Sequence, residues 1–180
     1  MILKFPDQIL DTESVSVLEN LSIAEIEKLI ARMRSACWNA NGFGIAAIQI
    51  GEPFRIFGYL SKSKRDLKWI IDPEVISTSG SSIFEEGCLS IPGYYWEILR
   101  PEKITLKFKS TSDDNISLDE KEAIKTFKGV ESRVIQHELD HMDGLCIPDS
   151  MSEKEFDDFR SHFFSGKPVY EYNSPRLDMR

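Results

Sequence analysis

The chain has 180 residues, of which 41% are hydrophobic, and its formal net charge is −8 at pH 7. This length and apolar fraction suit one catalytic or binding domain, residues 1–180, with its own core. The negative charge without a basic run argues against a nucleic-acid groove, and no apolar run approaches the roughly 20 residues that cross a membrane. We therefore expect neither nucleic acid nor membrane as a partner.

The N-terminus and the cysteines indicate a cytoplasmic protein. The segment MILKFPDQIL lacks the apolar length and the small-residue cleavage site of a secretory signal peptide. The three cysteines, Cys37, Cys88 and Cys146, cannot all pair because their number is odd. In a reducing compartment such a count favours free thiols or a metal ligand over a disulfide framework.

The first predicted element is a helix over residues 23–40. Ser22 and Glu25 form a capping box that begins it, and Asn41-Gly42 ends it. A glycine-spaced segment, GFGIAAIQIG, comes next. The apolar residues that recur at helical spacing are Ile26, Leu29, Ile30, Met33 and Cys37.

Strand-like runs fill the middle of the chain. Asp113-Asp114-Asn115 predicts a turn. The run 116–127 fits either a hairpin or a helix, and we favour strands because the β-rich run before it needs pairing partners. The expected strands before that turn are residues 54–60, 68–72, 74–79, 94–100 and 103–110.

Two helices are predicted in the C-terminal third. The first runs over residues 129–141 and is stopped by Gly144. Ser152 and Glu155 form a second capping box, which begins a short acidic helix that reaches about residue 164. Residues 165–180 carry two prolines and are expected to form an irregular tail.

The stretch QHELDH, residues 136–141, predicts a metal site. His137 and His141 are four residues apart, so both lie on one face of a helix and can reach a single ion. Glu138 points about 100° round the helix, which places a carboxylate near the ion without making it a ligand. Neutral imidazoles bind the metal in this H-E-x-x-H pattern while the carboxylate handles protons.

Val130 and Val134 precede His137 by seven and three residues and share its face of the helix. An apolar patch is therefore expected beside the metal. The same valines equally fit an ordinary core position. The two interpretations are compatible, since a pocket wall is usually also a core surface.

The third metal ligand has several candidates. An H-x-x-G-x-x-H continuation fits as far as Gly144, but the position that should be histidine is Ile147, and Asp149 comes two places late. Cys88 is favoured because it lies in EEGCLSIPG, between glycine and a Pro-Gly turn where backbone can approach closely. The other candidates are Glu153 and Glu155 on a following helix, and His162 and Cys146.

Three separate stretches resemble the peptide deformylases. GFGIAAIQ (42–49), EGCLS (86–90) and QHELDH (136–141) are similar to the three motifs of that family, in the same order. The resemblance extends from about Ile2 to Met151. It implies an α+β fold, with antiparallel β-sheets surrounding a central H-E-x-x-H helix and the 23–40 helix packed outside.

The resemblance also implies the cofactor and the reaction. Cys88, His137 and His141 would hold one divalent ion, commonly Fe²⁺, with Zn²⁺, Ni²⁺ or Co²⁺ able to replace it. The reaction is removal of the N-formyl group from the initiator methionine of newly made polypeptides, with release of formate. A metal-bound hydroxide attacks, and Glu138 acts as general base and then general acid.

Further site residues follow from the same resemblance. Gln49 and the Leu89 backbone N–H would stabilise the oxyanion. Gly42 and Gly44 leave room for a peptide that adds as a strand near Gly44-Ile45. The pocket for the first side chain would be lined by Phe43, Ile45, Val130, Val134 and the ring of His137, with Glu86 and Gly87 completing the substrate site.

Some features around the motifs differ from the family or extend it. Arg100 is expected to form a structural pair with Glu86, and Asp11 replaces a common arginine after PDQIL. Tyr94-Tyr95-Trp96 forms either a substrate rim or a packed sheet surface. The C-terminal region SEKEFDDFRSHFF is acidic, which argues against its docking on the phosphate-rich ribosome.

Two other functions compete with deformylation. A small metallopeptidase would use the same helix with Glu153 or Glu155 as third ligand, and would tolerate loss of Cys88. A metal-stabilised binding module would saturate the ion with four protein ligands, Cys146 among them, and would tolerate loss of Glu138.

Overall fold

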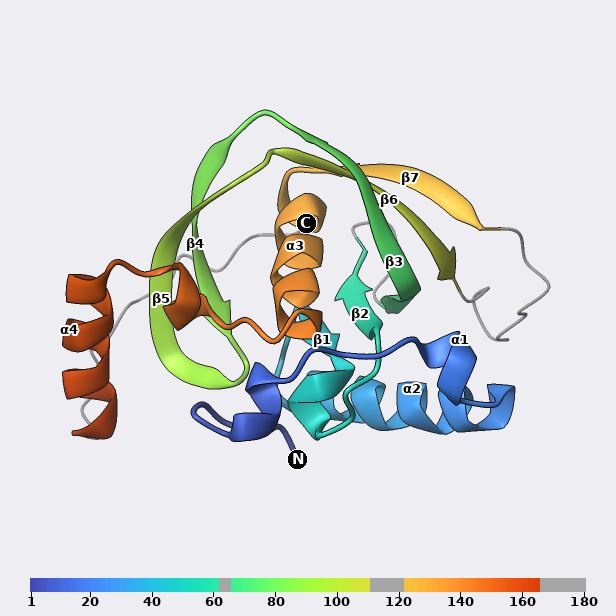
Figure 1. Ribbon diagram of the computed structural model, residues 1–180, viewed down its shortest axis with the longest axis horizontal. Coiled ribbons are helices and arrows are strands. Elements are labelled where there is room, and N and C mark those ends of the chain that lie inside the picture. Colours follow the sequence, from blue (N-terminus) through green and yellow to red (C-terminus); the bar gives the residue numbers. More distant parts are fainter. Residues whose placement is uncertain (62–65, 111–121, 166–180) are drawn as a thin grey trace.

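A computed structural model describes residues 1–61, 66–110 and 122–165. In these ranges a five-stranded antiparallel sheet has the order β1-β2-β3-β6-β7, and β4 and β5 form a separate two-stranded sheet (Figure 1). The two sheets arch around one helix, α3, which lies at the centre of the molecule. The strands of the larger sheet are β1 Gly44–Ala46, β2 Ile56–Leu60, β3 Leu67–Ser79, β6 Lys103–Ser110 and β7 Ala123–Lys128.

The central helix α3, Val130–Met142, carries both histidines. Gly129 precedes it with φ 60°, and Gly144, with φ 73°, follows it in the left-handed conformation typical of a helix end. The prediction of a helix over 129–141 that Gly144 stops is confirmed. The helix packs on the larger sheet through a cluster that includes Ile135, Leu139, Met142, Phe57, Ile70 and Phe127.

The hairpin of β4, Ser82–Cys88, and β5, Ile91–Arg100, places Cys88 at the end of a strand facing α3. The pairing runs in register from Ser82 opposite Arg100 to Gly87 opposite Tyr95 and then shifts at Cys88. The sequence pattern does not predict β4, and β5 begins three residues before the predicted 94–100. Two adjacent glutamates and a glycine in SIFEEGC hide the alternation by which a strand is identified.

The strand β3 replaces the two strands predicted at 68–72 and 74–79. Its register with β6 shifts between Ile71 and Glu74, where Asp72 has φ 45° and Pro73 has no N–H to donate. This bulge turns the Asp72 carboxylate onto the N-terminus of the short helix α1, Val17–Asn20, where it accepts from Val17 N at 2.8 Å. The two predicted strands are therefore one strand with a bulge at Asp72-Pro73.

The helix α2, Ile23–Asn39, packs outside the larger sheet, as predicted. Its capping box is present, since Ser22 N donates to Glu25 Oε2 at 2.8 Å. The five apolar residues expected on its inner face are all buried. Asn41 then adopts φ 54° and turns the chain into the Gly42-Phe43-Gly44 segment. The α+β architecture with a central H-E-x-x-H helix is thus confirmed.

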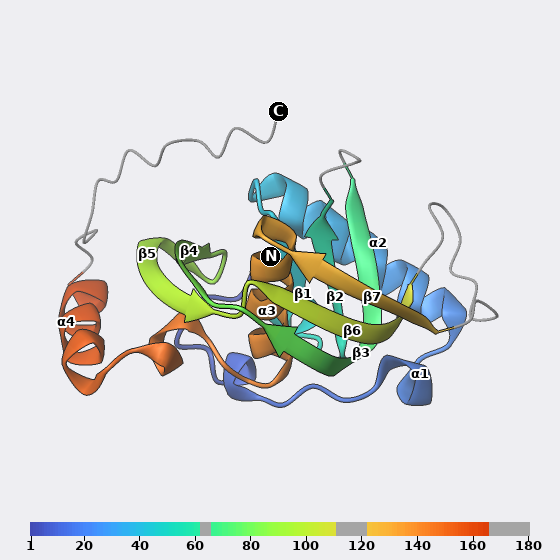
Figure 2. The same ribbon diagram turned by 90° about the horizontal axis from the view of Figure 1, so that it is seen from above.

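The helix α4, Glu153–Phe164, packs beside β5 at the edge of the molecule (Figure 2). Its Phe159 ring lies 5.5 Å from the ring of Tyr94 and 5.3 Å from that of Trp96. Tyr95, between them, points to the other side of the strand and lines a pocket. Of the two interpretations of Tyr94-Tyr95-Trp96, a packed sheet surface therefore holds for Trp96 and a pocket rim for Tyr95, while Tyr94 packs on α4 and also lines the pocket.

Parts of the predicted pattern lie outside the described residues. These are the turn at Asp113-Asp114-Asn115, the beginning of the predicted run 116–127, and the tail beyond Ser165. The end of that run is strand β7, as we favoured. Across the described ranges, no helix is both long enough and apolar enough to cross a membrane.

Candidate metal centre and active site

Three side chains that could bind a metal converge where β4 meets α3. The ligand atoms of Cys88, His137 and His141 all lie within 4.8 Å of one another. The Cys88 sulfur is 3.2 Å from His141 Nε2, and the two imidazole rings are 4.9 Å apart and perpendicular. In residues 1–61, 66–110 and 122–165, this is the one such cluster of histidine, cysteine and acidic side chains.

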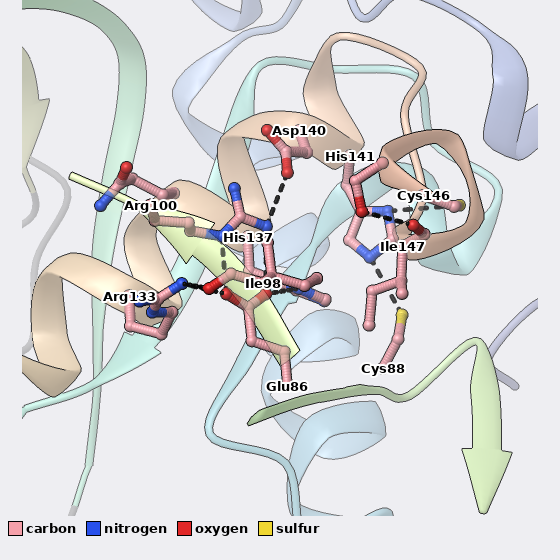
Figure 3. A network of polar contacts seen from close by, with 12 residues as sticks. Glu86, Cys88, Ile98, Arg100, Arg133, His137, Asp140, His141, Cys146 and Ile147 are labelled. Carbon is pink, nitrogen blue, oxygen red and sulfur yellow. Dashed lines mark hydrogen bonds and ion pairs between the residues drawn. The ribbon is translucent and has the colours of Figure 1, made fainter. Parts of the chain in front are cut away.

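The competing third ligands lie elsewhere. Glu155 accepts from the Ser152 N–H at 2.8 Å in the capping box of α4, on whose exposed surface Glu153 and His162 also lie. Cys146 contacts Nδ1 of His141 at 3.8 Å, across the ring from Cys88 (Figure 3). Neither α4 nor Cys146 supplies a ligand atom to the cluster.

Hydrogen bonds orient both imidazoles. His137 Nδ1 lies 3.0 Å from Glu86 Oε2, and His141 Nδ1 faces the Cys146 sulfur. Since Nδ1 of each histidine makes this contact, Nε2 of each histidine is left to face the other two residues of the cluster. Partners of this kind fix the tautomer and the ring orientation of histidines that bind metals.

Glu86 is the centre of a buried ionic network (Figure 3). Arg100 donates to both of its oxygens, at 2.6 and 3.0 Å, and Arg133 Nη1 lies 2.9 Å from Oε1. Burial would raise the pKa of Glu86, but the bonds from His137 and Arg100 outweigh it and lower the pKa to about 2. Glu86 is therefore a permanent carboxylate that supports His137.

The pairing of Arg100 with Glu86 agrees with the sequence analysis, whereas Arg133 was missed. Arg133 also donates to the carbonyls of Ile98 and Ser82, at 2.8 and 2.7 Å, and so ties α3 to both strands of the hairpin. Its position four residues before His137 was the available signal, because such a residue shares the histidine's face of the helix.

The surroundings of Cys88 favour its thiolate. Burial alone would raise the pKa of the thiol, but the charge of His141 and hydrogen bonds from His137 and His141 lower it well below its usual value. Ser90 N also donates to the sulfur at 3.3 Å. A thiolate with two imidazoles is a ligand set for a transition metal such as iron or zinc.

Glu138 lies beside the cluster and is fully enclosed. Its Oε2 is buried and has no hydrogen-bond partner within the described part of the chain. Burial raises the pKa of Glu138 to about 7, opposed only in part by the positive charges of His137 and His141. A buried carboxylate with an unpaired oxygen suits a group that exchanges protons with a bound molecule near neutral pH.

Gln49 aims its amide at the same point. It lies in the 3₁₀ helix η2, Ala47–Ile50, where its Oε1 accepts from Ala46 N at 3.0 Å. This bond fixes which end of the amide faces the cluster. Nε2 lies 3.6 Å from the Cys88 sulfur and 3.2 Å from His141 Nε2. A donor is therefore placed beside the ligand atoms.

A pocket of about 1010 Å³ opens onto these groups. Most of the predicted substrate residues line it, and these are Gly42, Phe43, Gly44, Glu86, Gly87, Val130 and Val134; Leu89, predicted as an oxyanion donor, lines it as well. Ile45 does not, which corrects the prediction for its side chain. The Ile45 side chain is fully buried in the cluster beneath α2, because alternate residues of a strand point to opposite faces.

The backbone at Gly44 forms one wall of the pocket. Gly44 begins β1, an edge strand of the larger sheet, so one side of its backbone is not covered by a neighbouring strand. A Cβ added at Gly44 would collide with Glu138 Oε1 and would lie 2.7 Å from Val134 Cγ1. Because Gly44 has no side chain, space remains open between β1 and the carboxylate of Glu138.

A divalent metal ion fits this arrangement. The donor set has one sulfur and two nitrogens, which is one ligand short of the tetrahedral coordination common for zinc. The unpaired Glu138 oxygen lies beside it, where a water on the fourth position would need an acceptor. The ligand number, their spacing and the neighbouring carboxylate are all consistent with a catalytic rather than a saturated site.

Comparison with known proteins gives consistent results. A peptide deformylase from Thermodesulfovibrio yellowstonii is 32% identical over 170 residues, covering 92% of this chain and 97% of that protein. One from Pelodictyon phaeoclathratiforme is 39% identical over 135 residues, covering 72% of this chain and 68% of that protein. The crystal structure of a peptide deformylase from Legionella pneumophila matches with a TM-score of 0.80 at 31% identity, covering 92% and 93% of the two chains.

The profile of the polypeptide deformylase family matches residues 1–157, a range that includes Gln49, Cys88 and the whole of α3. The match thus covers each segment that contributes to the cluster and its pocket. On this evidence, together with the similar sequences and fold, the chain belongs to the peptide deformylase family of hydrolytic enzymes.

Proposed function

We propose that the protein removes the N-formyl group from the N-terminal formylmethionine of newly made polypeptides, with Cys88, His137 and His141 holding one divalent metal ion. The observation that carries this proposal is the convergence of one thiolate and two imidazoles beside a buried carboxylate oxygen without a partner. Membership of the peptide deformylase family supplies the reaction class.

The residues divide the chemistry between them. A bound metal ion would supply a Lewis acid that makes water nucleophilic near neutral pH. Glu138 takes the proton of the attacking water and then delivers it to the leaving amine nitrogen. The Gln49 amide and the Leu89 backbone N–H donate to the oxyanion that develops on the formyl carbon's oxygen.

The pocket binds the substrate in an extended conformation. The peptide pairs with the uncovered side of β1 at Gly44, as an added strand. The methionine side chain enters the apolar part of the pocket between Phe43, Val130 and Val134. Burying it contributes at most about 3 kcal/mol, so the fit of the formyl group at Gln49 and Leu89 provides the rest of the discrimination.

The physiological metal we propose is Fe²⁺, with Zn²⁺, Ni²⁺ or Co²⁺ as replacements. Sulfur and imidazole ligands suit all of these ions. A thiolate bound to ferrous iron makes the site sensitive to oxygen and peroxide. Preparation under air should therefore reduce the activity of the iron form more than that of the nickel form.

The described elements are proposed to act as one catalytic domain in the cytoplasm, on nascent chains. The larger sheet packs on α2 through one buried cluster and on α3 through another, and the β4–β5 hairpin packs on α4 through a third. The exposed part of α4 includes Glu153, Glu155, Asp157 and Asp158. Because such a surface repels phosphate, we do not expect α4 to dock on ribosomal RNA.

Release of formate tests the proposal directly. The nickel-loaded protein should release formate from formyl-Met-Ala-Ser, and the iron-loaded protein should do so under anaerobic conditions. Acetyl-Met-Ala-Ser is the matched control, because its added methyl group does not fit where the formyl hydrogen lies. Cleavage between residues of the peptide without formate release would instead indicate the metallopeptidase.

Gln49→Leu is expected to lower kcat by about 10²–10³-fold while the protein keeps its metal, because one oxyanion donor is lost. Formate release and metal content by atomic emission measure the two effects. Gln8→Leu, on an exposed position, is the control and should change neither. Metal loss in Gln49→Leu would show that Gln49 supports the ligands rather than the oxyanion.

Gly44→Ala is expected to lower kcat/KM by on the order of a hundredfold, because the new methyl group displaces Glu138 and narrows the substrate's path. The fold should survive, since Val134 and the Glu138 side chain can shift. Steady-state kinetics with formyl-Met-Ala-Ser measure the effect, and the melting temperature checks the fold. Wild-type kinetics in a folded variant would refute the placement of the substrate at β1.

A further inference from the structure

Lys4 reaches the metal-binding loop from the N-terminal segment. Its side chain is exposed and lines the rim of the pocket, and its Nζ donates to the Leu89 carbonyl at 2.6 Å. We propose that Lys4 is a positioning residue for deformylation, which acts through the Leu89–Ser90 peptide group on the Cys88 sulfur. This inference rests on the proposed function, because it assigns Cys88 as a metal ligand.

One peptide group connects the lysine to the sulfur. The carbonyl of that group, Leu89 O, accepts from Lys4, and its N–H, on Ser90, donates to the Cys88 sulfur at 3.3 Å. A charge-assisted bond at a carbonyl polarises the whole peptide group and strengthens its N–H as a donor. The ammonium charge is thereby transmitted to the thiolate without direct contact.

The segment around Lys4 is held in place although the side chain is exposed. Leu3 N donates to the carbonyl of Gln49 at 2.8 Å, and Phe5 N donates to the carbonyl of Ser90 at 3.0 Å. The Phe5 ring also packs 5.7 Å from the ring of Phe159 on α4. Residues 3–5 therefore connect both segments that supply the oxyanion donors, with Lys4 fixed between two anchored neighbours.

Two consequences follow for the reaction. A stronger hydrogen bond to the thiolate withdraws electron density from the sulfur, which would make a bound metal ion a stronger Lewis acid. The bond to Leu89 O also restrains the conformation of Leu89, whose N–H is one of the oxyanion donors. Loss of the Lys4 charge should therefore affect kcat more than KM.

The test uses the full chain loaded with Co²⁺, in which sulfur ligation produces a charge-transfer band. In Lys4→Met this band should move to lower energy, because a less polarised peptide stabilises the sulfur electrons less. The value of kcat should fall by on the order of tenfold, the lower end for supporting residues of metal sites, with KM near wild type. Lys4→Arg should restore both, since it keeps the charge and the donor.

Lys154→Met, which removes an exposed charge on α4, is the control and should match the wild type. If the charge-transfer band of Lys4→Met lies at the same energy as in the wild type, the role of Lys4 is overturned and the proposed function stays intact. The same shift in Lys154→Met would also overturn it, because the effect would then follow net charge alone. Absence of a sulfur band from the wild type itself would overturn the proposed metal site and this inference together.

Discussion

Glu138→Gln is expected to lower kcat for formate release by about 10²–10⁴-fold while the protein keeps its metal. Glutamine has nearly the same shape but cannot take a proton from water. Glu138 is the buried acid beside the cluster that has an unpaired oxygen among the described residues, and burial raises its pKa to about 7, where it can both accept and return a proton. Formate release in a single turnover measures the loss of activity, and metal content shows that the metal is retained.

The matched control for this change is Glu131→Gln. Glu131 lies on α3 two turns before Glu138 and is 3.4 Å from the Ser61 hydroxyl, away from the cluster. It should retain wild-type turnover. Full activity in Glu138→Gln would contradict the proposed mechanism and would favour a metal-stabilised module in which this carboxylate has no chemical part.

Cys88→Ser is expected to remove both the metal and the activity. Loss of residues that only support a metal ligand typically reduces affinity or activity by 10–100-fold, so loss of the ligand itself should leave less than about one hundredth of the turnover. A serine hydroxyl is neither ionised at neutral pH nor a soft ligand. Metal content after dialysis and formate release are the measurements.

Cys37→Ser is the control for that substitution, because Cys37 is also a buried cysteine but lies outside the cluster. Burial, together with the negative charge of Glu138, raises the pKa of its thiol to about 12, so it is a neutral group. It contacts the Gly44 carbonyl at 3.6 Å, a bond that a serine hydroxyl can replace. If Cys88→Ser instead kept metal and activity, the metallopeptidase with another third ligand would be the better account.

Local patterns predicted α2, α3 and α4 and pointed to the residues of the candidate metal cluster. The capping box at Ser22 and the spacing of apolar residues are properties of neighbouring positions, and both describe α2 correctly. The i, i+4 spacing of His137 and His141 likewise fixes their shared face on α3. Cys88 was favoured from its loop, but the family resemblance was needed to choose it over the acidic residues of α4.

The remaining errors arise where distant segments determine the structure. Glu86 is buried because Arg100, Arg133 and His137 surround it, and no property of the SIFEEGC segment indicates those partners. The strand β4 therefore could not be distinguished from a loop by periodicity. Ile45 was assigned to the pocket from the family resemblance, but the packing of α2 on the sheet turns its side chain into the core.

Supporting contacts were the least predictable part of the site. Asp72 caps α1 from 55 residues away in sequence, and Lys4 reaches Leu89 across 85. Such contacts depend on tertiary placement rather than on any repeat or motif. They show why the motif residues could be proposed from the sequence, while the groups that orient their side chains required the structure.

X-ray absorption of the zinc-loaded full chain tests the central claim most directly. The structure predicts one sulfur at about 2.3 Å and two imidazole nitrogens at about 2.0–2.1 Å, with one further light atom from solvent. A shell of nitrogen and oxygen alone would contradict ligation by Cys88, and two sulfurs with two nitrogens would indicate a saturated structural site. Either result would remove the basis for deformylation at this centre.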